Sequence, residues 1–141
     1  MPVDNPVASS VATLLVQKKQ VLLGRRFESR GDEKKFIGWQ CPGGYLQKGE
    51  SVEQAAQKYC IQKAGIEIIE MRPGPYTNNI FSEQLHTTTL YLIGERYRIV
   101  NQSQFESEQY QWRWFDFEQL PKLLFLPLTF LAEDIMSGHY G

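Results

Sequence analysis

The residues best placed to do chemistry lie close together in the chain, between Gly43 and Lys63. Gly43 and Gly44 lack side chains, so their backbone either approaches a phosphate group closely or forms only a tight turn. Lys63 offers a cation that either binds a phosphate in place of a metal ion or is solvated. Glu50 offers a carboxylate that pairs with Lys58 or supplies an oxygen ligand to a metal. The chemistry that the glycines and the lysine share is the binding of phosphate.

Two further side chains are candidates for ligand binding. Arg25 lies in a predicted strand, where it either reaches a phosphate or is solvated. Trp39 precedes the glycine turn and either stacks on a base or packs in the core. We expect Trp112 and Trp114 to lie on one face of a strand, because side chains alternate along it, and to pack in the core.

The element that follows Glu50 is a helix. Ser51 and Gln54 have the spacing of a capping box, in which each side chain bonds the other residue's free backbone N–H. Gly65 stands where a left-handed C-terminal cap is expected. Between them, apolar residues recur on a 3.6-residue period, which predicts one buried stripe: Val52, Ala55, Ala56, Tyr59 and Cys60.

The rest of the chain is mainly extended. β-branched and apolar runs predict strands, Gly and Pro mark turns, and a period of 3.6 predicts a closing helix. Strands are expected at 11–16, 21–26, 66–71, 76–81, 86–97 and 111–114, with a short extended piece at 39–41. We expect a loop at 28–35 and a break in a strand at 73–75. A helical turn is expected at 117–121 and a helix at 127–136. This content predicts a single α+β domain over residues 1–141, with helices packed on a mixed sheet.

The segment from Gly44 to Ile66 resembles the Nudix box. In that family the pattern is a Gly, five residues, a Glu, seven residues, Arg-Glu, an aliphatic, any residue, Glu-Glu, any residue, a Gly and an aliphatic. Gly44, Glu50, Gly65 and Ile66 fix the register. The segments 22–26, 39–44 and 112–115 also resemble the family, most closely its MutT-type members. The resemblance implies a Nudix-type α/β/α sandwich with a central box helix, and makes Glu50 the catalytic candidate.

The resemblance also implies Mg²⁺-dependent hydrolysis of a nucleoside diphosphate linked to a further group, but this chain departs from the pattern where the metal binds. Lys58-Tyr59 replaces Arg-Glu, and Gln62-Lys63 replaces Glu-Glu, so all three metal-binding glutamates are absent. Two unit charges 4 Å apart interact by about 4 kcal/mol at an effective dielectric near 20, and a dication beside Lys63 would be repelled more strongly. We therefore expect no metal in the box, and Mg²⁺ only if ligands exist outside it.

Three functions stay open, and so does whether the protein is an enzyme. The first is a binder of a nucleotide or nucleoside-diphosphate derivative whose Mg²⁺-dependent hydrolysis is lost or strongly reduced. The second is an active nucleotide-sugar hydrolase that resembles GDP-mannose mannosyl hydrolases, with metal ligands such as Glu83 from outside the box. The third is a partner-binding domain without a ligand, for which a homodimer is an open option.

Composition limits the other partners. The 141 residues are 42% hydrophobic and 22% charged, which excludes a disordered chain. A net charge of −1 gives no global attraction to nucleic acid or to a membrane surface. The longest apolar stretch, 123–132, is short and contains Pro127, and no signal peptide is visible. Two cysteines fit a reduced, cytoplasmic protein, and the expected partner is a nucleotide or nucleotide sugar.

Overall fold

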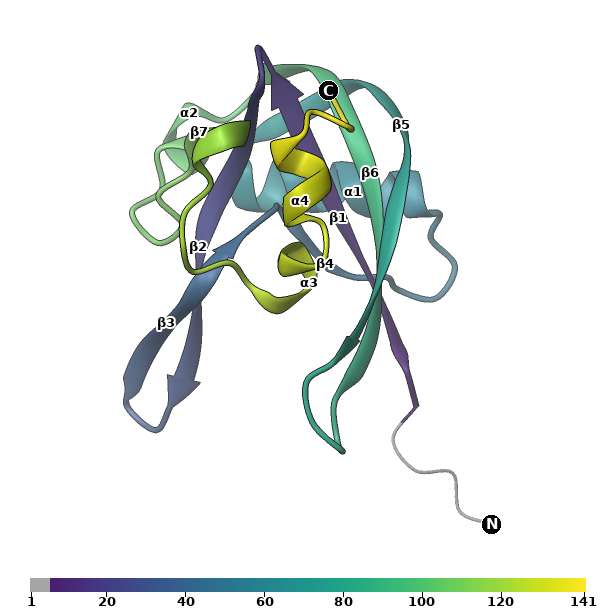
Figure 1. Ribbon diagram of the computed structural model, residues 1–141, viewed down its shortest axis with the longest axis vertical. Helices are drawn as coiled ribbons and strands as arrows, with labels where there is room; N and C mark the ends of the chain where they lie inside the picture. The colour runs from purple at the N-terminus through teal and green to yellow at the C-terminus, as the bar shows by residue number, and fades with distance from the viewer. Residues whose placement is uncertain (1–5) are drawn as a thin grey trace.

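The computed structural model describes residues 6–141, and a mixed sheet of seven strands forms their centre (Figure 1). The main path of the sheet is β3–β2–β1–β6–β5, while β4 pairs with β1 and β7 with β2. Within this part of the chain β1 and β6 run parallel, and the other strand pairs are antiparallel. The strands are β1 (Ala8–Gln17), β2 (Gln20–Arg30), β3 (Glu33–Gln40), β4 (Gly43–Tyr45), β5 (Ile66–Ile80), β6 (His86–Ile99) and β7 (Arg113–Asp116).

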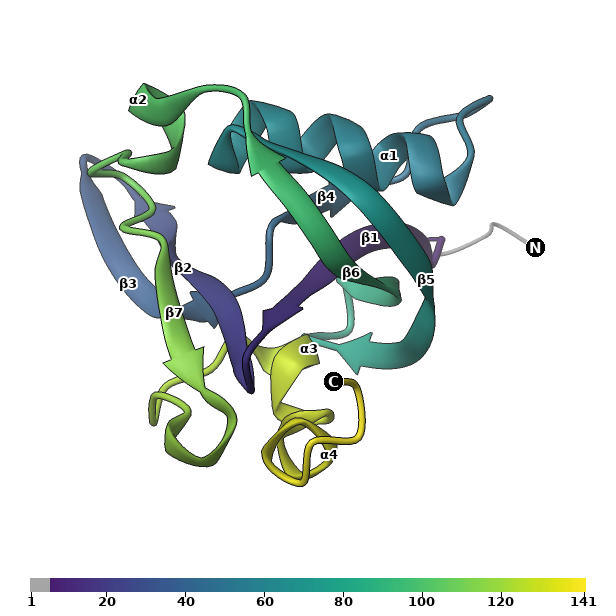
Figure 2. The ribbon, with the colours of Figure 1, turned by 90° about the horizontal axis from the view of Figure 1, so that it is seen from above.

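Helices cover the sheet on both sides (Figure 2). The α-helix α1 (Val52–Tyr59) and the π-helical turn η1 (Cys60–Ala64) that continues it lie on one side; α3 (Leu126–Thr129) and α4 (Ala132–Met136) lie on the other. The remaining elements are α2 (Gln102–Phe105) and the 3₁₀ turn η2 (Phe117–Gln119). This is the predicted α+β sandwich with a mixed sheet. No helix within residues 6–141 is long and apolar enough to cross a membrane.

Strand β1 lies at the centre of the core because both of its faces are covered. Val11 packs with Ala55 and Ala56 of α1, whereas Leu14 packs with Leu128 of α3 on the opposite side. A strand buried on both faces has apolar residues in succession rather than in alternation, as 11–16 does apart from one threonine.

The capping box predicted for the central helix is present. The Ser51 hydroxyl accepts from the backbone N–H of Gln54 at 3.0 Å, and the Gln54 side chain accepts from that of Ser51 at 2.8 Å. Gly65 ends the helix in the left-handed region, with φ 66°. A Cβ at this position would lie 2.2 Å from the Asn101 carbonyl oxygen, so both backbone conformation and space require glycine.

The stretch 28–35 is not a loop, as the sequence suggested, but the tip of a β-hairpin. Strand β2 continues to Arg30 and β3 begins at Glu33. The pairing is supported by an aromatic contact between Phe27 and Phe36, whose ring centroids are 5.7 Å apart, and by opposite charges facing one another, as at Arg30 and Glu33. The hairpin forms one wall of a cleft described below.

The prediction that 73–75 breaks a strand was also wrong. β5 is a single strand from Ile66 to Ile80, and its register with β6 shifts between Pro73 and Tyr76. Pro73 is tolerated because β5 is an edge strand and the irregularity removes the need for a regular ladder there.

The C-terminal helix predicted at 127–136 is divided into α3 and α4. At the division, the N–H groups of Phe130 and Leu131 donate to carbonyls three residues earlier, which interrupts the α-helical ladder. Trp112 and Trp114 pack in the same apolar cluster, as predicted, although Trp112 precedes β7.

Candidate functional site

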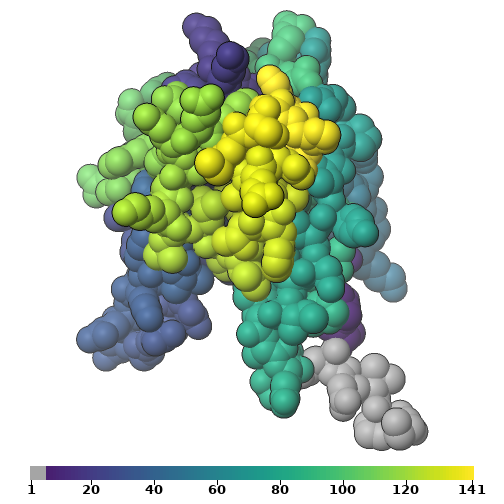
Figure 3. Space-filling view, in the orientation of Figure 1, coloured from purple at the N-terminus to yellow at the C-terminus, as the bar shows by residue number. Residues whose placement is uncertain are grey.

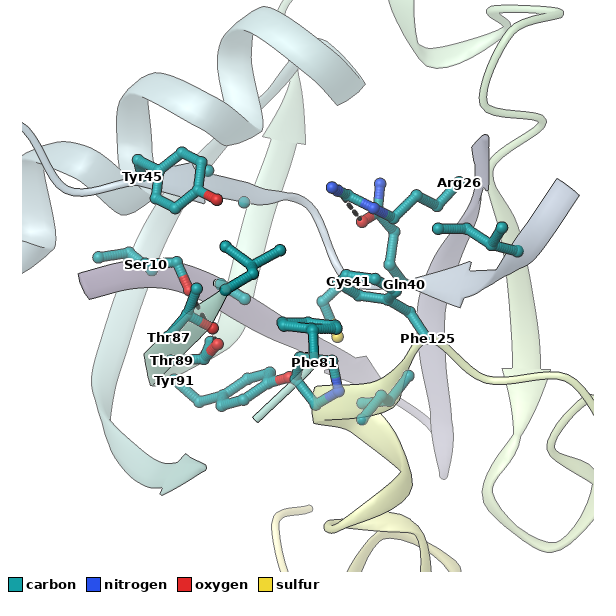
Figure 4. Close-up of a pocket in the computed structure, with 18 of the residues that line it drawn as sticks. Ser10, Arg26, Gln40, Cys41, Tyr45, Phe81, Thr87, Thr89, Tyr91 and Phe125 are labelled. Atoms are coloured by element: carbon teal, nitrogen blue, oxygen red, sulfur yellow. Dashed lines mark hydrogen bonds between the residues drawn. The ribbon is translucent and has the colours of Figure 1, made fainter. Parts of the chain in front are cut away.

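A cleft of about 520 Å³ opens between the β2–β3 hairpin and the wall formed by β1, β4 and β6 (Figure 3). Figure 4 shows Arg26 and Gln40 on one side of it, and Ser10, Thr87 and Thr89 on the other. Its volume lies within the range of small-molecule sites, about 300–1,000 Å³. The cleft is therefore large enough for a nucleotide-sized ligand.

One wall of the cleft is a network of hydroxyl groups. The hydroxyls of Ser10 and Thr89 bond at 2.8 Å, and the Asn79 amide donates to Thr87 at 3.0 Å and to Thr89 at 2.9 Å. Asn79 is fully buried behind these threonines, and its Oδ1 has no partner within residues 6–141. The network fixes the threonine hydroxyls at the surface of the cleft, where each retains hydrogen-bonding capacity.

The other wall carries aromatic rings and a cation. Phe27 and Phe125 line the cleft on this side, and Phe81, which follows β5 on the opposite side, stacks on Phe125 with centroids 5.5 Å apart. The Arg26 guanidinium lies 4.3 Å from the centre of the Phe125 ring and donates to Gln40 Oε1 at 3.1 Å. Burial lowers the pKa of Arg26 from its usual value. A planar group and a negative charge are the chemistry that this wall complements.

Glu50, which precedes α1, forms an ion pair with Lys58 in the last turn of that helix. Lys58 Nζ lies 2.9 Å from Glu50 Oε2 and 3.1 Å from Oε1, and Oε1 also accepts from the backbone N–H of Gln47 at 2.7 Å. The hydrogen bond from Lys58 lowers the pKa of Glu50, and the same bond raises the pKa of Lys58. The pair joins the loop 46–50 to the helix, so both carboxylate oxygens of Glu50 are already in use.

Tyr59 fills the space above the glycine turn. Its hydroxyl donates to the backbone carbonyl of Tyr45, and its ring lies so close to Gly44 that a Cβ there would be 2.5 Å from ring carbons. Lys58 and Lys63 flank the ring, with Nζ atoms 4.5 Å and 5.1 Å from its centre. An aromatic ring between two cations therefore stands beside the turn.

Lys63 reaches from η1 to the same turn and donates to the carbonyl of Gly43. The Lys63 backbone is fixed by two side chains, since Gln104 and Trp112 each donate to its carbonyl at 2.9 Å. Burial, followed by repulsion from Arg26, lowers the pKa of the Lys63 ammonium. Its terminal group is thus held in place near Arg26.

The NUDIX domain profile matches residues 5–134, which is most of the chain. The chain belongs to the Nudix family. Its fold is similar to that of a MutT Nudix hydrolase from Burkholderia pseudomallei, with 17% identity, 92% of this chain and 98% of that chain covered, and a TM-score of 0.72. A Nudix hydrolase from Nitrosomonas europaea has 16% identity, coverage of 96% and 91%, and a TM-score of 0.74.

A third structure, titled an ADP compounds hydrolase, has 12% identity, coverage of 79% of this chain and 58% of that chain, and a TM-score of 0.59. At these identities the similarity shows the Nudix fold. The function of this chain has to be argued from its own residues.

The residues at the Nudix metal positions do not fit Mg²⁺. A hard cation requires oxygen ligands, whereas this chain presents the Lys63 ammonium and the Tyr59 ring there, and the Tyr59 hydroxyl is hydrogen-bonded to Tyr45. No group of three or more His, Cys, Asp or Glu side chains placed to hold a metal occurs in the described part of the chain. Glu83, suggested by the sequence as an outside ligand, is not among the cleft residues, but Glu28 is.

The structure brings together some of the predicted site residues and not others. Gly43 and Gly44 line the cleft, and Lys63 contacts Gly43 from the adjoining side. Arg25 does not line it: its guanidinium lies 4.7 Å from the Phe27 ring centre and 3.4 Å from the Glu108 carbonyl. The arginine that lines the cleft is its neighbour Arg26, which the sequence did not single out.

Trp39 also lies outside the cleft. It packs edge-on against Phe115, with centroids 4.9 Å apart, and beside the core of the α3–α4 side. Among the other cleft residues that the sequence did not single out are Gln40, Thr87, Thr89 and Phe125. Hydroxyl and aromatic residues in predicted strands carry no signal of their own, because nothing in a single sequence shows which strands will face one another.

Proposed function

We propose that this protein binds a nucleotide or nucleoside-diphosphate derivative in the cleft and that its Mg²⁺-dependent hydrolysis is lost or strongly reduced. The observation that carries the proposal is the position of Lys63 and Tyr59 against the glycine turn, where the family's metal ligands belong. An ammonium group repels the dication that the family's reaction requires. The cleft beside it nevertheless stays open.

The chemistry of the cleft supports a nucleotide-like ligand. The rings of Phe27, Phe81 and Phe125 form an apolar lining against which a planar base can pack, and Thr87 and Thr89 offer hydroxyls for its polar edge. Gly43 and Gly44 permit close backbone approach to phosphate. The similar structure titled an ADP compounds hydrolase is consistent with a ligand built on a nucleoside diphosphate. A cytoplasmic location is part of the proposal, supported by two free, buried cysteines.

Ligand binding is tested by calorimetry with nucleoside mono-, di- and triphosphates and nucleotide sugars. Phe125→Ala should weaken binding of the best ligand about tenfold or more, because it removes a ring from the cleft wall. The matched control is Phe130→Ala, which removes an exposed phenylalanine ring that does not line the cleft. Binding of none of these compounds, or equal effects of both variants, would contradict the proposal.

The loss of metal binding is tested by restoring the family's glutamates in the triple variant Tyr59→Glu, Gln62→Glu and Lys63→Glu. Three carboxylates at i, i+3 and i+4 lie on one helix face and can share a dication. Mn²⁺ affinity measured by calorimetry should rise from undetectable in the wild type. If the Mn²⁺ affinity does not rise, the missing carboxylates are not the reason why the wild-type box fails to bind metal.

The nucleotide-sugar hydrolase is the second candidate, and Glu28 favours it as a carboxylate that lines the cleft. This alternative requires turnover of a nucleotide sugar with a divalent metal that Glu28→Gln abolishes. Binding without such turnover would favour the first proposal.

A further inference from the structure

Two cations, Arg26 and Lys63, lie near one another beside the glycine turn, and the carboxylate that acts on Arg26, Glu28 of the cleft, forms no salt bridge with either in the described part of the chain. Within residues 6–141, neither Arg26 nor Lys63 is among the residues that form salt bridges. They are close enough that Arg26 contributes to lowering the pKa of the Lys63 ammonium. Gly43 connects them, because it lines the cleft with Arg26 and accepts the hydrogen bond from Lys63.

The hydrogen-bond and ring partners of these cations are neutral, and the charge of Glu28 acts on Arg26 only from a longer distance. Arg26 is held by the Gln40 amide oxygen and the Phe125 ring, and its Nε is buried without an acceptor. Lys63 is held by the Gly43 carbonyl and the Tyr59 ring. Neutral partners orient a cation without compensating its charge, and the single carboxylate of Glu28 does not balance two cations, so an anion that joins them relieves their repulsion. The remaining donors of both groups can serve an anion without breaking these contacts.

We propose that Arg26 and Lys63 form a metal-independent anion subsite, which holds the phosphate groups of the cleft's ligand as the free anion rather than as its Mg²⁺ complex. This inference rests on the proposed function and specifies the state of the ligand. Mg²⁺ would neutralise the phosphate charge that the two cations attract, and the protein supplies no carboxylate cluster to hold the ion in return. Mg²⁺ therefore opposes binding.

The sign of the Mg²⁺ effect is the first test. ADP, GDP, CDP and UDP are titrated into the wild-type protein by calorimetry, once with EDTA and once with excess Mg²⁺, and each parent nucleoside serves as the phosphate-free comparison. The diphosphate that binds best should bind about tenfold or more tightly with EDTA, and its nucleoside should be insensitive to Mg²⁺. Equal or tighter diphosphate binding with Mg²⁺ overturns the subsite and leaves the proposed cleft function standing. Failure of every compound to bind overturns both.

The residues are tested by two pairs of variants. Arg26→Gln is compared with Arg25→Gln, since the two arginines are adjacent and only Arg26 lines the cleft. Lys63→Met is compared with Lys48→Met, which removes an exposed lysine from the loop 46–50. Arg26→Gln and Lys63→Met should each weaken diphosphate binding in EDTA at least tenfold, about 1.4 kcal/mol. Each should also leave nucleoside binding unchanged and abolish the Mg²⁺ effect. Equal losses within either pair, or equal losses for the nucleoside, would overturn the assignment.

Discussion

Gly44→Ala should destabilise the protein through Tyr59 alone, and this prediction tests whether the tyrosine ring fills the space beside the glycine turn. An added Cβ would lie 2.5 Å from two ring carbons of Tyr59 and 2.9 Å from a third. Normal carbon contacts are about 3.5–4.0 Å, so the ring must move by about 1 Å. The backbone itself is not a reason for glycine, because Gly44 is not among the residues with a positive φ.

The magnitude follows from two terms. Overpacking of this kind costs about 1–3 kcal/mol. Displacing the ring also breaks the hydrogen bond from the Tyr59 hydroxyl to the Tyr45 carbonyl, which contributes about 1 kcal/mol. Gly44→Ala should therefore lower the free energy of unfolding by about 2–4 kcal/mol in the presence of Tyr59.

The assay is urea unfolding of a double-mutant cycle. In a Tyr59→Ala background the ring is gone, so Gly44→Ala should change the free energy of unfolding by less than about 0.5 kcal/mol. The control is Gly49→Ala, whose φ of 87° makes alanine unfavourable with nothing within 4 Å of the added Cβ. This control should have the same effect in both backgrounds. An additive result for Gly44 and Tyr59 would refute the reasoning.

Three other predictions concern the helix, the ion pair and the thiols. Ser51→Ala removes the N-cap acceptor and should lower the free energy of unfolding by about 1 kcal/mol in urea, whereas no change would argue against the capping box. The hydrogen bond from Lys58 lowers the pKa of Glu50. The stability that this bond adds to the folded protein is therefore present above the unfolded-state pKa of about 4.3 and is lost as the pH falls below it. Glu50→Gln should therefore be less stable than the wild type at pH 7, with a difference that shrinks towards pH 3; a constant difference would contradict this. Burial raises the pKa of Cys60 to about 12 and that of Cys41 further, so native protein should not react with Ellman's reagent at pH 8 until it unfolds.

The central helix was predictable because its signals are local. Ser51 and Gln54 interact with each other's backbone, and Gly65 ends the helix through its own φ and the nearby Asn101. The errors in 28–35 and 73–75 have a different cause, since both segments are extended by pairing with a partner strand. Pro73 pairs with Leu92, which is distant in the sequence, so the turn residues of 73–75 alone suggested a break. The segment 28–35 pairs within itself, but its charged residues show no apolar alternation, so they suggested a loop.

The site was predictable only in part for the same reason. The absent glutamates were visible in the sequence, because the box is contiguous. Which of Arg25 and Arg26 enters the cleft depends on a register shift between Arg26 and Phe27, which only the pairing with β3 shows. Trp39 was expected either to stack on a base or to pack in the core, and it packs on Phe115.

Turnover is the most direct test of whether Mg²⁺-dependent hydrolysis is lost or strongly reduced. Nucleoside triphosphates, nucleotide sugars and dinucleotides are incubated with the purified protein in Mg²⁺ or Mn²⁺, and product is quantified with and without a chelator. We expect product to form no faster with metal than with chelator, even for the compound that binds best. Turnover at ordinary enzyme rates that the chelator abolishes would contradict it.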